Sequence, residues 1–468
     1  MSTISNLQKA RAAYQPKLPK ALQGPVKVVE GAATESVGNQ AEIKELFPNT
    51  YGMPVVEFAE GGQPSSAEFN VGIILSGGQA PGGHNVISGL YDGVKSINPA
   101  NKLYGFLMGP GGLVDHKYIE FTDSLIDAYR NTGGFDTACK TYSELIGNIE
   151  RDCNSARKYW HFIKLMGRSA SHIALECALQ TQPNICLISE EVEAKNMSLD
   201  DVVTYIAEVV AKRAAAGNNF GTVLVPEGII EFIPAIKKLI AELNEVLTDP
   251  ATGESRVFSS KDEQVAFVKS HIAPENLAVL ESLPKDVERQ LCLDRDPHGN
   301  VQVSLIETEK LLSAMVATKL AAWKAEGKYN GKFSAQHHFF GYEGRCAAPS
   351  NYDADYCYSL GYNASRLIAA GKTGYMSVIR NTTAPAAEWI AGGVPITMMM
   401  NLERRNGAMK PVIRKALVEL DGAPFKYFAS KRDEWAEQTA YVYPGPIQYW
   451  GPSEVCDQTT KTLQLEHK

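Results

Sequence analysis

The sequence predicts an α/β protein in which doubly wound parallel sheets carry a helical insertion. Two observations support this fold class. Short all-apolar runs end in glycine-rich or polar segments and are followed by helical patterns, and this alternation recurs along the chain. Between about residues 233 and 323 the apolar period changes to that of helices. The chain has 468 residues, and single cores stop growing at roughly 250–300 residues, so we expect two or three packed units.

The first 70 residues are irregular and punctuated by proline and glycine, and we expect an arm that wraps a larger body or a partner subunit. The first strand is predicted at 71–75. The loop 76–83 follows it with four glycines, and Asn85 is expected to cap the next helix. Backbone amides of such a loop, next to the positive end of a helix, suit a phosphate group. A tight turn with glycines for packing is the alternative.

Further strands are predicted at 103–108, 161–166, 222–225 and 337–340. Open α/β sheets bind ligands beyond the carboxyl ends of their strands, so the residues just after these runs are candidates. Arg168 follows the strand at 161–166 and could bind a phosphate, with Ser169 as the cap of the next helix. Glu227 follows the strand at 222–225 and could accept hydrogen bonds from sugar hydroxyls. Tyr342 and Arg345 follow the last as an aromatic hydroxyl and a second phosphate clamp. Structural arginines, a solvent-facing turn acid and an exposed loop are the alternatives.

The helical segment should begin near residue 233 with one apolar stripe, and Ser304 and Glu307 have the spacing of a capping box for a later helix. Outside these elements, Glu190 and Glu191 are expected to form a solvated strand end. His337 and His338 should serve packing, because neighbours on a strand point apart and cannot both ligate one metal. No pair of cysteines has C-x-x-C spacing, so buried thiols are expected rather than disulfides or a zinc site. The eight cysteines are Cys139, Cys153, Cys177, Cys186, Cys292, Cys346, Cys357 and Cys456.

The charge pattern excludes one large class of partners. The net charge is -7, and acidic and basic residues are interspersed without a basic cluster, which argues against nucleic acid. No stretch of about 18 apolar residues suggests a membrane span, and the first residues lack a signal-peptide pattern. We expect a soluble cytoplasmic protein.

Several of these segments together resemble one family, the long-form pyrophosphate-dependent phosphofructokinases. The matching motifs are Ser-Gly-Gly-Gln-Ala-Pro-Gly-Gly-His-Asn at 76–85, Lys158-Tyr159, Met166-Gly167-Arg168, Pro226-Glu227-Gly228 and Tyr342-Glu343-Gly344-Arg345. The likeness runs from about residue 10 to the C-terminal end. It implies a pair of doubly wound domains and reversible transfer of a phosphoryl group from pyrophosphate to fructose 6-phosphate, with Mg²⁺, in glycolysis or gluconeogenesis.

The resemblance also implies roles for individual residues. Gly77 and Gly78 would bind pyrophosphate. Lys158 and Tyr159 would reach into a neighbouring subunit's site, so a homodimer or a larger assembly is implied. The sugar phosphate would be held by Met166, Gly167, Arg168, Glu227, Tyr342, Glu343, Gly344 and Arg345.

Two motifs of the family are absent from this chain. These are Gly-Gly-Asp-Asp, which supplies the metal-binding acid, and Pro-Lys-Thr-Ile-Asp-Gly-Asp, which supplies the catalytic base and a lysine. Two family segments that share Gly-Phe-Asp are fused at 133–140, which points to a missing internal segment of about two strand–helix units. No residue here takes the roles of base, lysine or metal ligand. Asp136 lies at the seam, and we expect a turn acid rather than a substitute base.

The sequence therefore predicts five regions: an arm at 1–70, the remnant of a pyrophosphate-binding half at 71–136, a fructose-6-phosphate-binding half at 137–232, a helical insertion at 233–330, and a return segment with the C-terminal region at 331–468. Three functions follow from the resemblance. One is an active pyrophosphate-dependent enzyme. Another is a catalytically impaired variant or regulatory subunit that binds sugar phosphate or a full-length subunit without turnover. The third is an ATP-dependent relative.

Overall fold

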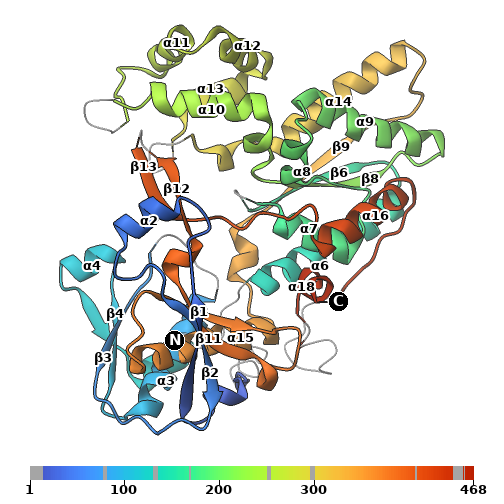
Figure 1. The fold of residues 1–468 in the computed structure, drawn as a ribbon. Coiled ribbons are helices and arrows are strands. Elements are labelled where there is room, and N and C mark those ends of the chain that lie inside the picture. Colours follow the sequence, from blue (N-terminus) through green and yellow to red (C-terminus); the bar gives the residue numbers. More distant parts are fainter. Residues whose placement is uncertain are drawn as a thin grey trace.

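The computed structural model describes residues 14–76, 82–129, 135–167, 170–249, 255–295, 301–405, 408–445, 457 and 459–467. The described chain forms two lobes, with a cluster of helices at one end of the molecule (Figure 1). Among the described residues, no helix combines the length and apolar character needed to cross a membrane.

A four-stranded parallel sheet forms the centre of the upper lobe, with strand order β7-β8-β6-β9. Its strands are β6 (Trp160–Leu165), β7 (Ile185–Cys186), β8 (Gly221–Pro226) and β9 (Ala335–Phe340). Phe162 and Val223 enter the core on one face of the sheet, while Ile163 and Leu224 enter the core on the other. Because both faces are buried, β6 and β8 are mainly apolar, with His161, Lys164 and Thr222 as buried polar exceptions. The α/β fold class is confirmed.

Helices cover both faces of this sheet. One face carries α6 (Phe135–Ala156), α7 (His172–Thr181), α16 (Ala423–Glu437) and α18 (Lys461–Glu466). The other face carries α9 (Leu199–Ala215) and α14 (Thr308–Ala325). The short α8 (Ser189–Ala194) and the 3-10 turn η2 (Ile229–Phe232) follow β7 and β8.

The helical pattern expected after residue 233 is confirmed. It consists of α10 (Pro234–Val246), α11 (Lys261–His271), α12 (Pro274–Ser282) and α13 (Lys285–Leu293), which form the cluster at the top of Figure 1. The capping box expected at Ser304 and Glu307 was wrong, because α14 has Glu307 itself as its N-cap residue and no side-chain cap bond. The 3-10 turn η3 (Val303–Leu305) occupies that position instead.

The lower lobe holds a three-stranded sheet of order β3-β4-β5. Strands β3 (Asn70–Ile74) and β4 (Lys102–Phe106) are parallel, and β5 (Tyr118–Glu120) is antiparallel to β4. The associated helices are α3 (Gly83–Ile97), α4 (Pro110–Val114) and α5 (Asp123–Tyr129). Helix α3 starts before the expected cap at Asn85, with Gly82 as its N-cap residue.

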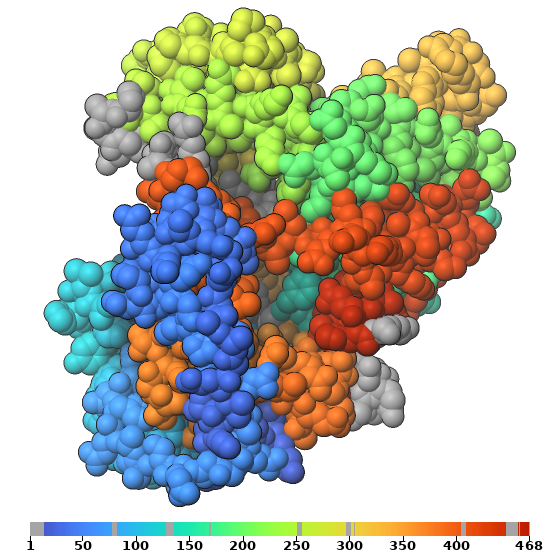
Figure 2. All heavy atoms as spheres, viewed as in Figure 1, coloured from blue at the N-terminus to red at the C-terminus, as the bar shows by residue number. Residues whose placement is uncertain are grey.

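A second sheet of the lower lobe corrects the expectation that residues 1–70 are irregular. Antiparallel strands β1 (Val26–Ala33), β2 (Pro54–Glu60), β11 (Ile390–Pro395) and β10 (Tyr375–Arg380) lie in that order. The N-terminal segment, coloured blue in Figure 2, thus builds a sheet with the C-terminal region on the outside of this lobe. The other elements of this part are η1 (Lys20–Leu22), α2 (Gln40–Leu46), α15 (Asn351–Ala369), η5 (Ala386–Glu388), η6 (Ile396–Met399) and the hairpin of β12 (Met400–Arg405) and β13 (Ala408–Ile413).

Helices α3 and α15 pack closely through glycines. A Cβ atom at Gly89 would lie 2.0 Å from the carbonyl oxygen of Tyr358, and one at Gly361 would lie 2.0 Å from that of Val86. No side chain fits at either position without movement of the backbone. Helix α15 begins next to α6 of the upper lobe, where it is hydrogen-bonded to Asp136 and Thr137. Helix α15 therefore connects the two lobes.

Candidate functional site

The carboxyl edge of the upper sheet brings several predicted residues together. Leu165 is in register with Pro226 of β8 and with Phe340 of β9, so the residues that follow these three lie side by side. Two backbone bonds extend the pairing beyond the strands. Met166 N donates to Phe340 O over 3.0 Å, and Glu227 N donates to Leu165 O over 2.9 Å. Met166, Gly167, Glu227 and the turn after β9 therefore share one edge.

Glu227 is buried, with 8% of its surface exposed, and its Oε2 accepts a hydrogen bond from Gly167 N over 2.9 Å. Gly167 has φ +130°, a conformation that side chains disfavour, which explains the glycine. The carboxylate thus fixes the backbone at the start of the 167–170 loop. The alternative of a solvent-facing turn acid is wrong.

The turn after β9 is the 3-10 segment η4 (Tyr342–Cys346). Glu343 Oε1 accepts a hydrogen bond from Gly341 N over 2.7 Å, so this carboxylate stabilises the turn itself. The Tyr342 side chain is exposed at 63%, and the Arg345 guanidinium lies 5.2 Å from the centre of its ring. Stacking of this kind orients the planar guanidinium. Gly344, in the same turn, is buried.

Tyr142 of α6 supports this turn and was not found from the sequence. Its hydroxyl donates to Gly341 O, and its ring stacks on Phe340 with centroids 5.9 Å apart. A Cβ atom at Gly344 would lie 2.4 Å from the Tyr142 ring. Burial raises the pKa of Tyr142, so the hydroxyl keeps the proton that it donates. The apolar stripe of α6 could have indicated that Tyr142 is buried, but not what it contacts.

Lys158 and Tyr159 lie at the opposite end of the sheet, because they precede β6. The six residues of β6 span roughly 20 Å at about 3.3 Å per residue, which separates this pair from Glu227. The Lys158 ammonium lies 5.1 Å from the centre of the Tyr159 ring. The structure therefore does not bring these two residues to the edge formed by Glu227 and Tyr342. Gly77, Gly78 and Arg168 lie outside the described residues.

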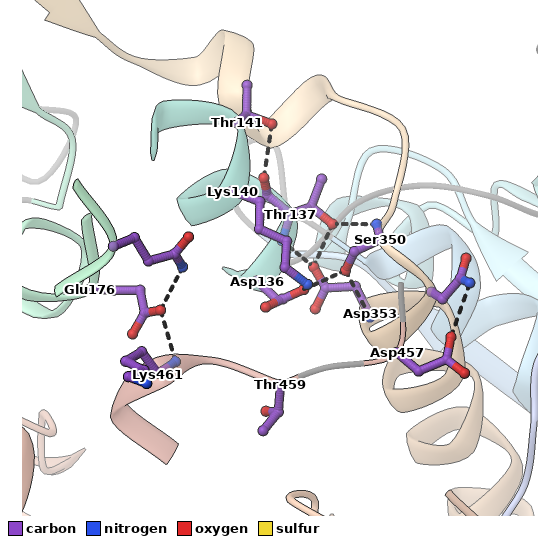
Figure 3. Close-up of polar contacts among 12 residues, drawn as sticks. Asp136, Thr137, Lys140, Thr141, Glu176, Ser350, Asp353, Asp457, Thr459 and Lys461 are labelled. Atoms are coloured by element: carbon purple, nitrogen blue, oxygen red, sulfur yellow. Dashed lines mark hydrogen bonds and ion pairs between the residues drawn. The ribbon is translucent and has the colours of Figure 1, made fainter. Parts of the chain in front are cut away.

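Asp136 joins two helices from a buried position in the first turn of α6. Only 1% of its surface is exposed, and its Oδ2 contacts Lys140 Nζ at 2.6 Å and accepts a hydrogen bond from Ser350 Oγ over 2.5 Å (Figure 3). The neighbouring Thr137 donates through its N and Oγ1 to Asp353 Oδ2, over 2.7 and 2.6 Å. The expectation of a simple turn acid was wrong, since Asp136 connects α6 to the start of α15.

The described residues offer no group of three or more His, Cys, Asp or Glu side chains placed to hold a metal ion. His337 and His338 point apart, as expected for neighbours on a strand, but His337 is exposed and only His338 is half-buried, so the packing role does not hold for His337. His337 Nε2 lies 2.7 Å from Ser313 Oγ, and His338 Nε2 lies 3.0 Å from His161 Nδ1. Burial lowers the pKa of His161 to about 4, so this pair is neutral at pH 7.

The expectation of a solvated strand end at Glu190 and Glu191 was wrong. Glu190 is buried, and its Oε1 accepts hydrogen bonds from Ser171 N over 3.1 Å and from Val418 N over 3.0 Å. Glu191 binds Arg432 Nη1 at 2.6 Å. Ser171 is also the residue that precedes α7, whose expected cap, Ser169, lies outside the described residues. Buried thiols are confirmed for Cys139, Cys153, Cys177, Cys186, Cys292 and Cys357, whereas Cys346 is exposed and Cys456 lies outside the described residues.

Comparison with known proteins gives consistent matches. A family model described as Phosphofructokinase matches residues 126–259. A pyrophosphate–fructose 6-phosphate 1-phosphotransferase of Porphyromonas gingivalis is 55% identical, covering 99% of this chain and 99% of the relative. One of Treponema pallidum (strain Nichols) is 45% identical, covering 99% and 97%. A solved structure of a pyrophosphate-dependent phosphofructokinase from Marinobacter aquaeolei aligns with a TM-score of 0.43 at 14% identity, over 70% of this chain and 83% of that one.

The alignment lengths show that this chain is shorter inside than its relatives. The Porphyromonas gingivalis alignment runs over 544 positions, 76 more than the 468 residues of this chain, although it covers 99% of both proteins. The extra positions must therefore be gaps in this chain. This agrees with the internal segment that the fused motif at 133–140 indicates to be missing.

Proposed function

The chain belongs to the family of the pyrophosphate–fructose 6-phosphate 1-phosphotransferases, and from this membership we propose that it transfers a phosphoryl group reversibly between pyrophosphate and fructose 6-phosphate, the forward product being fructose 1,6-bisphosphate. The observation that carries the proposal is the sheet edge. There, the buried Glu227, the Gly167 backbone and the turn with Tyr342 and Arg345 lie side by side, which supports the proposal.

The chemistry of this edge suits a phosphorylated sugar. Arg345 supplies a cation with donors in a planar fork, which matches phosphate oxygens. We propose that Arg168 is its counterpart on the loop that Gly167 begins, and that Tyr342 donates its hydroxyl to the same phosphate. Glu227 uses one carboxylate oxygen on Gly167 N. The other would accept a hydrogen bond from a sugar hydroxyl and so orient the ring.

Pyrophosphate would lie at Gly77 and Gly78, between β3 and the N-terminal end of α3. The family also implies Mg²⁺, which proteins usually bind through one or two carboxylates together with substrate phosphates. The described residues offer no group of three or more acidic, histidine or cysteine side chains for such a site, and Asp136 already uses its Oδ2 on Lys140 and Ser350. We therefore derive no step through the metal, and Mg²⁺ enters the proposal as the counter-ion of pyrophosphate.

We also propose that the chain forms an oligomer and is located in the cytoplasm. Lys158 is exposed and stands at the end of the sheet opposite Glu227, so it cannot serve the site of its own chain. We propose that Lys158 and Tyr159 reach the sugar-phosphate site of a neighbouring copy, in a homodimer or a larger assembly. A Lys158→Ala chain that binds sugar phosphate as tightly as the unaltered chain would contradict this arrangement.

The test of the function combines turnover with binding. The purified chain is incubated with fructose 6-phosphate, Mg²⁺ and either pyrophosphate or ATP, and fructose 1,6-bisphosphate is measured. We expect product with pyrophosphate and none with ATP. Calorimetric titration with fructose 6-phosphate runs in parallel. Binding without turnover would overturn the catalytic part of the proposal, and absence of both would overturn all of it.

A further inference from the structure

The segment 341–350 carries Tyr342 and Arg345 from the end of β9 to the start of α15, and α6 holds it at both ends. At the first end, the Tyr142 hydroxyl donates to Gly341 O. The Tyr142 ring lies between Phe340, on which it stacks, and Gly344, whose Cα faces the ring closely enough to exclude a side chain. One fully buried side chain thus fixes the entry and the middle of the turn.

At the second end, two neighbouring residues of α6 hold Ser350. Its hydroxyl donates to Asp136 Oδ2 over 2.5 Å, and its backbone N donates to Thr137 Oγ1 over 3.0 Å. The same hydroxyl accepts a hydrogen bond from Asp353 N over 3.2 Å and so caps α15. The contacts among Asp136, Thr137, Ser350 and Asp353 are drawn in Figure 3. They are buried, where each hydrogen bond is shielded from competition with water.

Helix α6 is itself a rigid support. Its inner face packs against α7 and the sheet through Ala138, Tyr142 and Ile146. Within the segment it supports, the backbone bond from Gly344 N to Gly341 O is long, at 3.4 Å. The Glu343 carboxylate stabilises the turn from within, and the contacts of α6 with Gly341 and Ser350 fix the position of the segment relative to the sheet.

We propose that α6 is the clamp that places Tyr342 and Arg345 for the sugar phosphate, with Tyr142 and Asp136 as positioning residues. Neither residue touches the substrate. This inference rests on the proposed function, because it assumes that Tyr342 and Arg345 bind fructose 6-phosphate. It also gives Asp136 a role other than that of a catalytic base.

The test removes one clamp contact at a time and separates placement from stability. Tyr142→Phe deletes only the hydroxyl. The matched control is Tyr375→Phe, because Tyr375 also donates to a backbone carbonyl, that of Pro54 at 2.8 Å, in the other lobe. Calorimetry gives the affinity for fructose 6-phosphate, and thermal denaturation gives stability. We expect Tyr142→Phe to weaken fructose 6-phosphate binding roughly 5- to 10-fold, as for one lost hydrogen bond, while the control binds as the unaltered chain does.

A second pair of variants tests the other end. Ser350→Ala removes the donor to Asp136, and Ser260→Ala removes a comparable helix cap, that of α11. Ser350→Ala should weaken binding at least 5-fold while Ser260→Ala should not, and this pair carries the test if Tyr142→Phe fails to fold. Affinity unchanged in both clamp variants would overturn the inference. If the unaltered chain does not bind fructose 6-phosphate, the proposed function itself fails, which is a distinct result.

Discussion

Replacing Gly344 by alanine should displace the turn that carries Tyr342 and Arg345. The new Cβ atom would lie 2.4 Å from the Tyr142 ring, about 1 Å closer than an ordinary contact. Gly344 does not have positive φ, so alanine can adopt its backbone conformation and the effect is purely steric. Tyr142 cannot retreat, because it is fully buried, stacks on Phe340 and donates to Gly341 O.

Overpacking of this kind costs about 1–3 kcal/mol. If the turn moves to relieve the contact, that free energy is lost from substrate binding, which corresponds to a decrease in affinity of about 5- to 150-fold. If the ring is forced aside instead, the same free energy is lost from folding. The expected result is therefore weaker fructose 6-phosphate binding, a lower Tm, or a division of the cost between them.

Calorimetric titration with fructose 6-phosphate and thermal denaturation measure the two effects. Gly24→Ala is the control, because a Cβ atom there meets no atom within 4 Å and Gly24 does not have positive φ. We expect the control to match the unaltered chain in both measurements. A Gly344→Ala chain with unchanged affinity and unchanged Tm would refute the claim that α6 and the turn pack too closely to admit a methyl group.

Three further changes test the fold. Burial raises the pKa of Glu150 well above its usual 4.5, so the folded chain retains a proton that the unfolded chain releases, and stability should fall as pH rises above about 4.5. Glu150→Gln should therefore raise Tm at pH 8 but not at pH 4, and an equal effect at both would contradict this. Gly89→Ala should lower the free energy of unfolding by about 1–3 kcal/mol through contact with Tyr358 O, whereas Gly111→Ala, which has open space, should not; urea denaturation compares them. Glu190→Ala should cost about 3 kcal/mol or more in the same assay, since its carboxylate accepts from two buried amides; a loss below about 1 kcal/mol would contradict the role given to it.

The upper sheet was predictable because burial on both faces favours short, mainly apolar strands such as β6 and β8. The arm was not. Strand β1 has mostly exposed or half-buried residues, so its apolar alternation is faint. Strand β2 pairs with Gly392 and Gly393, which lie more than 300 residues away in the sequence. A local pattern cannot indicate a partner so distant, and the arm therefore looked irregular.

The same limit applies to the site. Glu227, Tyr342 and Arg345 could be identified because each directly follows a predicted strand, and the edge of a parallel sheet collects such residues. Tyr142 and Asp136 lie within a helix, and their partners at Gly341 and Ser350 are about 200 residues further along the chain. From the sequence, Asp136 was expected to be a turn acid, and no role was predicted for Tyr142. Only the packing of α6 against the turn supports the role that we propose for them.

The sheets of the two lobes differ in how completely they are covered. In the upper lobe, β6 and β8 have both faces buried, and Glu227 binds the Gly167 backbone at their carboxyl edge. In the lower lobe, the one parallel pair among the described strands is β3 with β4, and apolar side chains near its carboxyl edge are exposed, Met108 at 87% and Val114 at 77%. Parallel sheets are normally covered on both faces, so this lobe has the surface that an absent segment would cover. Gly77 and Gly78, for which we propose pyrophosphate binding, follow β3, so we infer that the missing positions affect the pyrophosphate side of the proposed site.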